Sequence, residues 1–152
     1  MPRQSAGILL YRKTNNELEV LLVHPGGPFF VKKDLGSWTI PKGEYDDSEE
    51  ALAAAQREFE EEIGSPVTGT FLPLGTIRQK GGKVIQAWAV EGDLDADAIV
   101  SNTFELAWPP KSGKVETYPE VDKAVWFSVA EAKTRINEKQ AELIDRLVAL
   151  VV

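Results

Sequence analysis

The segment between Gly43 and Gly64 ends in a cluster of acidic residues at helical spacing. Glu58, Glu61 and Glu62 stand at positions i, i+3 and i+4, so a helix would place their carboxylates on one face. Like charges at this spacing destabilise a helix by roughly 0.2–0.5 kcal/mol per pair. A divalent cation would turn that repulsion into attraction, and Mg²⁺ suits such a site because it binds a few carboxylates, several waters and substrate phosphates. The pattern therefore predicts a helix able to hold a metal ion.

The ends of this helix are marked by capping signals. Asp47 followed by Glu50 fits a capping box led by Asp, so the helix is expected to begin near Asp47 or Ser48. Gly64 followed by Pro66 is a stop signal. An apolar stripe supplies the face that packs on the rest of the protein, formed by Ala51, Leu52, Ala55, Phe59 and Ile63.

The rest of the chain alternates between strand and helix patterns. Strands are expected at residues 5–12, 18–24, 38–40, 67–79, 83–91, 103–107 and 123–127, and further helices at 129–136 and 138–151. Residues 13–17 and the Lys-Gly-Gly sequence at 80–82 predict hairpin connections, whereas the paired prolines within 108–114 exclude a sheet interior. Strands, a helix, strands and then helices predict an α/β fold with a mixed sheet and helices packed against it.

Composition narrows the classes of protein that this chain can represent. Its 152 residues fit one domain over residues 1–152, and no apolar run reaches the roughly 18 residues of a membrane span. The absence of cysteine excludes disulfides and thiolate metal sites and is compatible with a cytoplasmic location. A formal net charge of −7 argues against binding to duplex nucleic acid, but it leaves room for a small phosphorylated substrate.

The acidic segment resembles the signature of the Nudix hydrolase family: Gly, five residues, Glu, seven residues, then Arg-Glu-apolar-any-Glu-Glu-any-Gly-apolar. The matching residues are Gly43, Glu49, Arg57, Glu58, Phe59, Glu61, Glu62 and Gly64. The sequence departs from the pattern at Ser65, where an apolar residue is usual, and Phe59 is bulkier than the common aliphatic residue. An acidic run alone usually marks a solvated face, and Glu60 is interpreted that way. The resemblance implies an α/β/α sandwich and hydrolysis of a nucleoside diphosphate linked to another group, X.

Carried over by position, the resemblance implies a Mg²⁺ or Mn²⁺ site formed by Glu58, Glu61 and Glu62. Either Glu58 or Glu62 would help to activate the attacking water. Glu49 would support the ligands or bind the metal through water. Arg57 would orient the glutamates by charge-assisted hydrogen bonds, and Gly43 would allow close backbone approach and offer its carbonyl as a ligand.

Further site residues are expected outside this segment. In many Nudix enzymes another acid comes from a loop before a late strand, and Glu120 is the candidate here, with Glu116 as the alternative. Lys42 would either meet a phosphate as a point charge or simply be exposed. Lys111 and Lys114 would be surface residues, or would grip a polyphosphate together from the glycine-containing loop that they flank. Trp38 would either stack on a base or pack in the core. His24 is interpreted as a structural residue.

The substrate is less constrained than the chemistry. The segment after the signature lacks the proline of ADP-ribose enzymes, and Trp38–Gly43 is similar to the entry segment of dinucleoside tetraphosphate hydrolases. A nucleoside tri- or polyphosphate is therefore expected, bound by a monomer or homodimer. The alternatives are a Nudix-fold sensor that binds a nucleotide without cleaving it and a purely structural domain. The three glutamates favour the enzyme.

Overall fold

In the computed structural model, which describes residues 4–152 except the side chain of Lys80, a mixed sheet forms the centre of the fold. Its order is β4 (Leu72–Arg78), β5 (Val84–Glu91), β1 (Gln4–Thr14), β2 (Glu17–Pro25) and β8 (Val121–Ser128), with β3 (Lys42–Glu44) paired to β1. β1 and β5 run parallel and all other pairs are antiparallel. This arrangement confirms the predicted mixed sheet.

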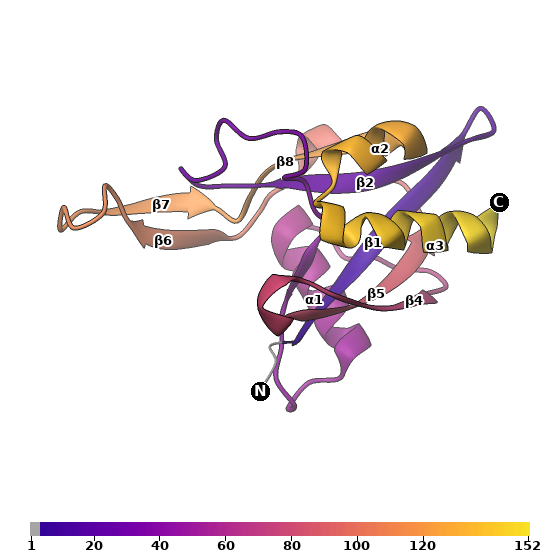
Figure 1. The fold of residues 1–152 in the computed structure, drawn as a ribbon, viewed down its shortest axis with the longest axis horizontal. Helices are drawn as coiled ribbons and strands as arrows, with labels where there is room; N and C mark the ends of the chain where they lie inside the picture. Colours follow the sequence, from indigo (N-terminus) through magenta and orange to yellow (C-terminus); the bar gives the residue numbers. More distant parts are fainter. Residues whose placement is uncertain (1–3) are drawn as a thin grey trace.

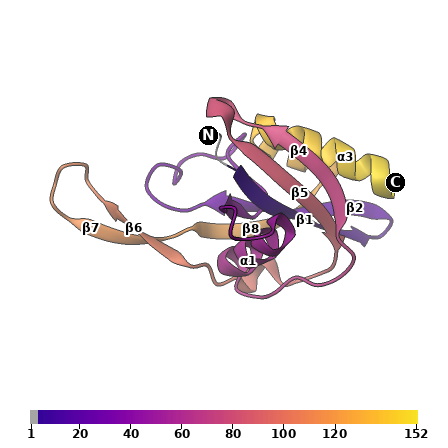
Figure 2. The same ribbon diagram turned by 90° about the horizontal axis from the view of Figure 1, so that it is seen from below.

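Helices cover both faces of the sheet, because β1 and β2 are apolar on both sides. Helix α1 (Ala51–Ile63) packs on one face, and α2 (Val129–Arg135) and α3 (Ala141–Val151) pack on the other (Figures 1 and 2). Alternate residues of β1 enter the two cores: Ile8 and Leu10 face α1, whereas Leu9 and Tyr11 face α2 and α3. The α/β/α sandwich implied by the resemblance is therefore confirmed.

Several connections follow their local sequence signals. Asn15 and Asn16 both have positive φ in the β1–β2 hairpin turn, a conformation that asparagine tolerates. The Lys80–Gly82 turn joins the antiparallel strands β4 and β5. Helix α1 ends at Gly64, which has φ of 92° and donates its backbone N–H to the Glu60 carbonyl.

The predicted start of α1 was wrong. The helix begins at Ala51, and its N-cap residue Glu50 makes no side-chain capping bond. Asp46 instead accepts a hydrogen bond from the backbone N–H of Ser48 at 2.9 Å, and the Glu49 N–H donates to the Asp46 carbonyl. These bonds hold a turn, and the competition of a short acidic side chain for nearby backbone groups delays the helix.

Two strand predictions also require correction, and one strand was missed. Residues 38–40 form only isolated bridges, Val23 with Thr39 and Trp38 with Ile136, and the strand lies after Pro41 as β3. β4 begins at Leu72 rather than at residue 67. β7 (Val115–Pro119) was not predicted, because its polar sequence forms a strand only by pairing with β6 (Thr103–Ala107).

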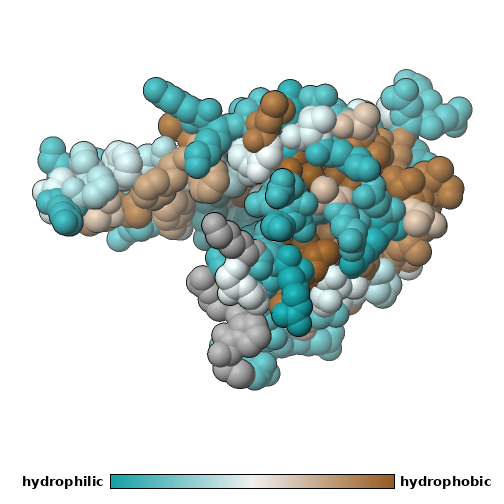
Figure 3. Space-filling model, in the orientation of Figure 1, coloured by the Kyte–Doolittle hydropathy of each residue, from teal (hydrophilic) through white to brown (hydrophobic). Residues whose placement is uncertain are grey.

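β6 and β7 form a separate two-stranded sheet that projects as an arm from the body (Figures 1 and 3). The irregular segment predicted at residues 108–114 makes its tip and includes a cis peptide bond between Trp108 and Pro109. No helix within residues 4–152 is long and apolar enough to cross a membrane. The single domain over residues 1–152 stays a prediction, and its first three residues lie outside the described part.

Candidate active site

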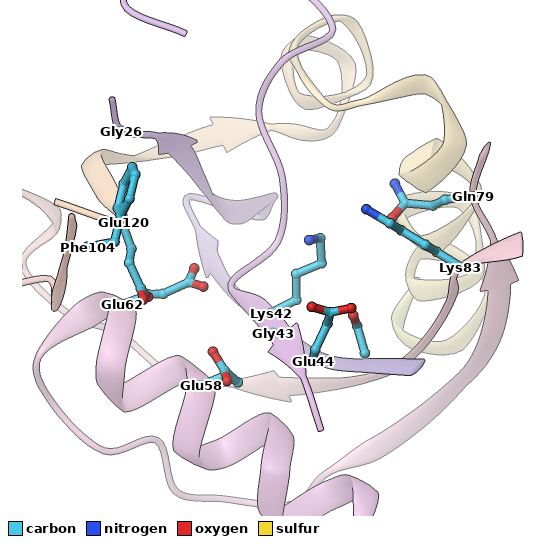
Figure 4. A pocket seen from close by; sticks show the side chains of 11 residues that line it. Gly26, Lys42, Gly43, Glu44, Glu58, Glu62, Gln79, Lys83, Phe104 and Glu120 are labelled. Carbon is cyan, nitrogen blue, oxygen red and sulfur yellow. The ribbon is translucent and has the colours of Figure 1, made fainter. Parts of the chain in front are cut away.

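A cavity of about 580 Å³ opens where α1, β3 and the base of the arm meet. Its lining residues are largely polar or charged: Ser5, Gly26, Lys42, Gly43, Glu44, Glu58, Glu62, Gln79, Lys83, Phe104 and Glu120. Figure 4 shows Glu58, Glu62 and Glu120 toward one side of the cavity, Gln79 and Lys83 at the other, and Lys42 between them. The three glutamates therefore lie together at one side of the cavity, whereas Glu44 lies beside Lys42.

The carboxylates of Glu58, Glu62 and Glu120 converge in this cavity. Each offers one oxygen that lies within 4.8 Å of the others. Glu58 and Glu62 are buried on successive turns of α1, and half-buried Glu120 comes from the short link between β7 and β8. The structure thus brings Glu58 and Glu62, which the helical spacing placed on one face, together with Glu120, which the resemblance suggested.

Backbone hydrogen bonds fix Glu120 beside the helix. Its N–H donates to the Asn102 carbonyl at 2.8 Å, and its own carbonyl accepts from the Gly26 N–H at 2.9 Å. The Asn102 N–H in turn donates to the Glu61 carbonyl near the end of α1 at 2.7 Å. Asn102 therefore links the open carbonyls of the helix end to the residue that completes the cluster.

Gly43 allows the closest approach in the site. A Cβ atom at this position would lie 2.0 Å from Cδ of Glu58, a distance that no packed structure tolerates. The missing side chain lets the Glu58 carboxylate lie directly against β3. The close backbone approach expected of Gly43 is therefore present, whereas the use of its carbonyl as a ligand stays a prediction.

Burial and crowding disfavour negative charge on all three acids. Burial raises the pKa of Glu62 well above its usual range, and the nearby charges of Glu58 and Glu120 add to this effect. Burial also raises the pKa of Glu58 and of Glu120, the latter helped by the charge of Glu61. Lys42 acts in the opposite direction on Glu62, through its charge and its backbone N–H.

Arg57 connects the carboxylates that surround the cluster. Its guanidinium donates to both oxygens of Glu49, at 2.7 and 2.8 Å. A third donor atom reaches Glu58 at 2.8 Å and Glu61 at 3.2 Å. These bonds lower the pKa of Glu49. The Glu61 carboxylate therefore contacts Arg57 and is not one of the three converging acids.

The donor set fits a hard divalent cation. Three carboxylates supply oxygen ligands of the kind that Mg²⁺ and Mn²⁺ prefer. Their raised pKa values show that negative charge is costly in the site without a counter-charge. A bound cation would remove this cost, and the open cavity leaves room for waters and substrate phosphates.

Three of the residues predicted to bind substrate do not line this cavity. Trp38 is 2% exposed, and its ring packs edge-on against Phe127 with a centroid distance of 5.1 Å. This position fits core packing and leaves no ring face for a base. Lys111 and Lys114 are exposed at the tip of the arm. Lys42 does line the cavity.

Glu116 and His24 also lie outside the cavity. Glu116, the alternative to Glu120, is exposed on β7. His24 is buried, with its ring nitrogens 2.9 Å from an Asp122 carboxylate oxygen and 2.7 Å from the Lys33 carbonyl. These contacts agree with the structural interpretation of His24.

Sequence reasoning missed six lining residues: Ser5, Gly26, Glu44, Gln79, Lys83 and Phe104. Gln79 and Lys83 flank the β4–β5 turn, and no local signal separates them from surface residues. Phe104 carried a weak signal, because it is the one aromatic residue in the short strand β6. Only the folded chain brings these residues to the glutamates.

Comparisons with solved structures place this fold among known proteins. An Ap4A hydrolase of C. elegans is 20% identical, with all of both chains covered and a TM-score of 0.67. The NUDIX domain of Shewanella oneidensis NrtR, solved with ADP ribose, is 18% identical and has a TM-score of 0.70, covering all of this chain and 90% of that one. A mutT/nudix family protein from Listeria innocua is 17% identical with a TM-score of 0.64, covering 99% and 95% of the two chains. These similarities show a shared fold.

The sequence comparisons differ in outcome. No curated protein sequence matches the chain. The family model described as the NUDIX domain matches residues 1–147, nearly the full length. The chain therefore belongs to the NUDIX domain family, the hydrolases that act on phosphoanhydride bonds.

Proposed function

We propose that this hydrolase cleaves a nucleoside tri- or polyphosphate with Mg²⁺, or Mn²⁺ in its place, as the cofactor. The observation that carries the proposal is the convergence of Glu58, Glu62 and Glu120 within 4.8 Å in a cavity that Lys42 and Lys83 also line. A polyphosphate needs both features, because the negative charge of its phosphates must be neutralised before a water-derived nucleophile can attack.

Each residue of the site has a proposed task. Glu58, Glu62 and Glu120 hold the cation, with Glu61 and the Gly43 carbonyl as further ligands. When bound, the cation neutralises phosphate charge and lowers the pKa of a coordinated water. Glu58 or Glu62 accepts a proton from the attacking water, a task suited to a carboxylate whose pKa is raised by burial.

Charged residues around the cluster hold the ligands and the substrate. Arg57, anchored on both oxygens of Glu49, fixes the orientation of Glu58. Lys42 and Lys83 bind phosphate oxygens beyond the scissile bond as point charges. The buried ring of Trp38 gives no support to base stacking at that residue.

A nucleotide panel with Mg²⁺ tests the proposal. Nucleoside triphosphates, dinucleoside polyphosphates and ADP-ribose are incubated with the protein, and released phosphate and pyrophosphate identify the bond that is cut. We expect turnover of a tri- or polyphosphate, lost on chelation of the metal. Glu62→Gln should lower turnover by about a hundredfold or more, because metal ions contribute several kcal/mol of charge stabilisation.

Glu60→Gln is the matched control. Glu60 is exposed on the same helix, two residues before Glu62, and does not line the cavity. Its variant should keep wild-type turnover. Saturable nucleotide binding by the wild-type protein without turnover of any compound would contradict the proposal and favour the sensor alternative.

A further inference from the structure

One aromatic ring lines the otherwise polar cavity, and neither core requires it. Phe104 of β6 is the single aromatic residue among the lining residues, and it belongs to neither hydrophobic core of the described chain. It is half-buried, whereas its neighbours Thr103 and Glu105 are exposed. A half-exposed ring beside a charged site calls for an explanation other than core packing.

The strand register places Phe104 on the face of the arm that leads to the carboxylates. Phe104 pairs with Tyr118 of β7, and their ring centroids lie 6.0 Å apart. Side chains alternate along a strand, so Tyr118 and Glu120 share one face, and the Glu120–Asn102 bond continues the pairing to that point. Phe104 and Glu120 both line the cavity, which agrees with this geometry (Figure 4).

The tip of the Phe104 ring lies close to the backbone of Gly27. A Cβ atom at Gly27 would lie 3.0 Å from Cζ of Phe104, and Gly27 has φ of 95°. Gly26, its neighbour, lines the cavity and bonds the Glu120 carbonyl. The absence of a side chain at Gly27 therefore allows the Phe104 ring to take this position beside the cavity.

We propose that Phe104, supported from behind by Tyr118, is the surface on which the base of the nucleotide stacks. The inference rests on the proposed function and names the residue that selects its substrates. A flat heterocycle gains from an aromatic face, whereas its polar edges suit the charged and polar lining of the cavity. An aliphatic group would leave the polar groups of that lining without hydrogen-bond partners.

This assignment sets the direction in which the substrate lies. With the base on Phe104, the phosphates pass the cluster of Glu58, Glu62 and Glu120 and extend toward Lys42 and Lys83. Base–aromatic stacking is tolerant of sequence because every base has a π-face, so the ring selects for a nucleotide over a simple phosphate rather than for one base.

Calorimetric binding of AMP and ribose 5-phosphate tests the proposal without requiring turnover. The two probes share sugar and phosphate and differ in the base. In the presence of Mg²⁺, the wild-type protein should bind AMP more tightly than ribose 5-phosphate. Phe104→Leu should weaken AMP binding by about 5- to 100-fold and leave ribose 5-phosphate binding unchanged.

Two further variants guard against a merely structural effect. Phe104→Tyr keeps an aromatic face and should retain the preference for AMP. Phe71→Leu makes the same Phe-to-Leu change at a half-buried ring that packs on the α1-side core and does not line the cavity, so it should bind both probes normally. Equal binding of the two probes by the wild type, or an equal loss of both in Phe104→Leu, would overturn the proposal.

The outcome is separable from that of the nucleotide panel. A wild-type protein that prefers AMP but hydrolyses nothing would refute the proposed function and leave the stacking surface standing. A wild-type protein that hydrolyses nucleotides but binds AMP and ribose 5-phosphate equally would refute the stacking surface and leave the proposed function standing.

Discussion

At the scale of single residues, the site contains carboxylates whose burial and proximity destabilise their charged forms. Glu62 is the clearest case, since it is buried beside Glu58 and Glu120 while Lys42 is the nearest compensating charge that influences it. The spacing of the glutamates in the sequence placed Glu58, Glu61 and Glu62 together, but the structure brings only Glu58 and Glu62 into the cluster and sets Glu61 against Arg57. The depth of burial, which raises the pKa of Glu62, follows only from the folded structure.

The raised pKa of Glu62 predicts a pH dependence of stability in metal-free protein. The folded state binds its proton more tightly than the unfolded state, whose pKa lies near 4.5. Stability should therefore fall as pH rises from that value through the folded pKa. Glu62→Gln removes this loss, so the variant should unfold at higher urea concentration than wild type at neutral pH.

Urea titrations between about pH 4.5 and pH 8 with a chelator measure the effect. Glu60→Gln, at an exposed position, should follow the wild-type curve. A Glu62→Gln variant no more stable than wild type at neutral pH would show that Glu62 carries no buried charge.

Gly43 gives a second prediction at this scale. In Gly43→Ala the new Cβ would lie 2.0 Å from Cδ of Glu58, so the carboxylate must move away from the cluster. Displacement of a catalytic group by about 1 Å costs on the order of a hundredfold in rate, and we expect a loss of turnover of that size. Gly43 is not among the glycines with positive φ, so the thermal midpoint should change little. Near-normal turnover would contradict the tight approach of Glu58 to β3.

At the scale of elements, the sequence predicted correctly those helix ends and strands that are determined by residues close together in the chain. Helix α1 ends at Gly64, as its capping signal indicated, and β1 and β2 are continuous apolar runs buried on both faces. β3 and β7 escaped prediction because each is a strand only through its partner, β1 or β6. Gln79 and Phe104 reach the site by tertiary contacts, which leave no periodicity in the sequence.

Substitution of the glycine at the end of α1 should destabilise the protein more than substitution of a glycine in an open turn. Gly64 has φ of 92°, and a Cβ there would lie 2.6 Å from the Val100 carbonyl oxygen. Gly36 has φ of 76° with nothing within 4 Å. Gly36→Ala therefore costs the conformational strain alone, about 1–2 kcal/mol. Gly64→Ala adds a clash and should cost about 2–4 kcal/mol.

Chemical denaturation of both variants tests this difference. The two substitutions are matched in chemistry and in the sign of φ, so the excess cost at Gly64 reports the packing against Val100. Equal destabilisation of the two variants would contradict the close packing at the end of α1.

At the scale of the whole molecule, the site exists because three separate parts of the chain converge. Helix α1 supplies Glu58 and Glu62, β3 supplies the glycine that admits Glu58, and the base of the arm supplies Glu120. Both cores hold the sheet between its helices, whereas β6 and β7 pair only with each other. The arm is therefore expected to contribute to the site through its base and little to the stability of the body.

Shortening the arm tests whether its outer part is dispensable for stability and turnover. Replacing residues 106–116 by Asn-Gly leaves Glu105 opposite Thr117, a geometry suited to a two-residue hairpin, and keeps Phe104, Tyr118 and Glu120. The replacement removes Trp108, whose ring packs edge-on against that of Phe29. We expect the free energy of unfolding to change by less than about 1 kcal/mol, with turnover retained. A collapse of the thermal midpoint would show that the arm supports the body.

Glu58, Glu62 and Glu120 are expected to form a binding site for a divalent cation. Anomalous diffraction from crystals grown with Mn²⁺ tests it most directly, because Mn²⁺ accepts the same oxygen ligands as Mg²⁺ and its anomalous signal identifies it. We expect an anomalous peak within about 2.0–2.3 Å of carboxylate oxygens from these three residues. Well-ordered glutamates with no peak between them, in crystals soaked at high Mn²⁺ concentration, would contradict it.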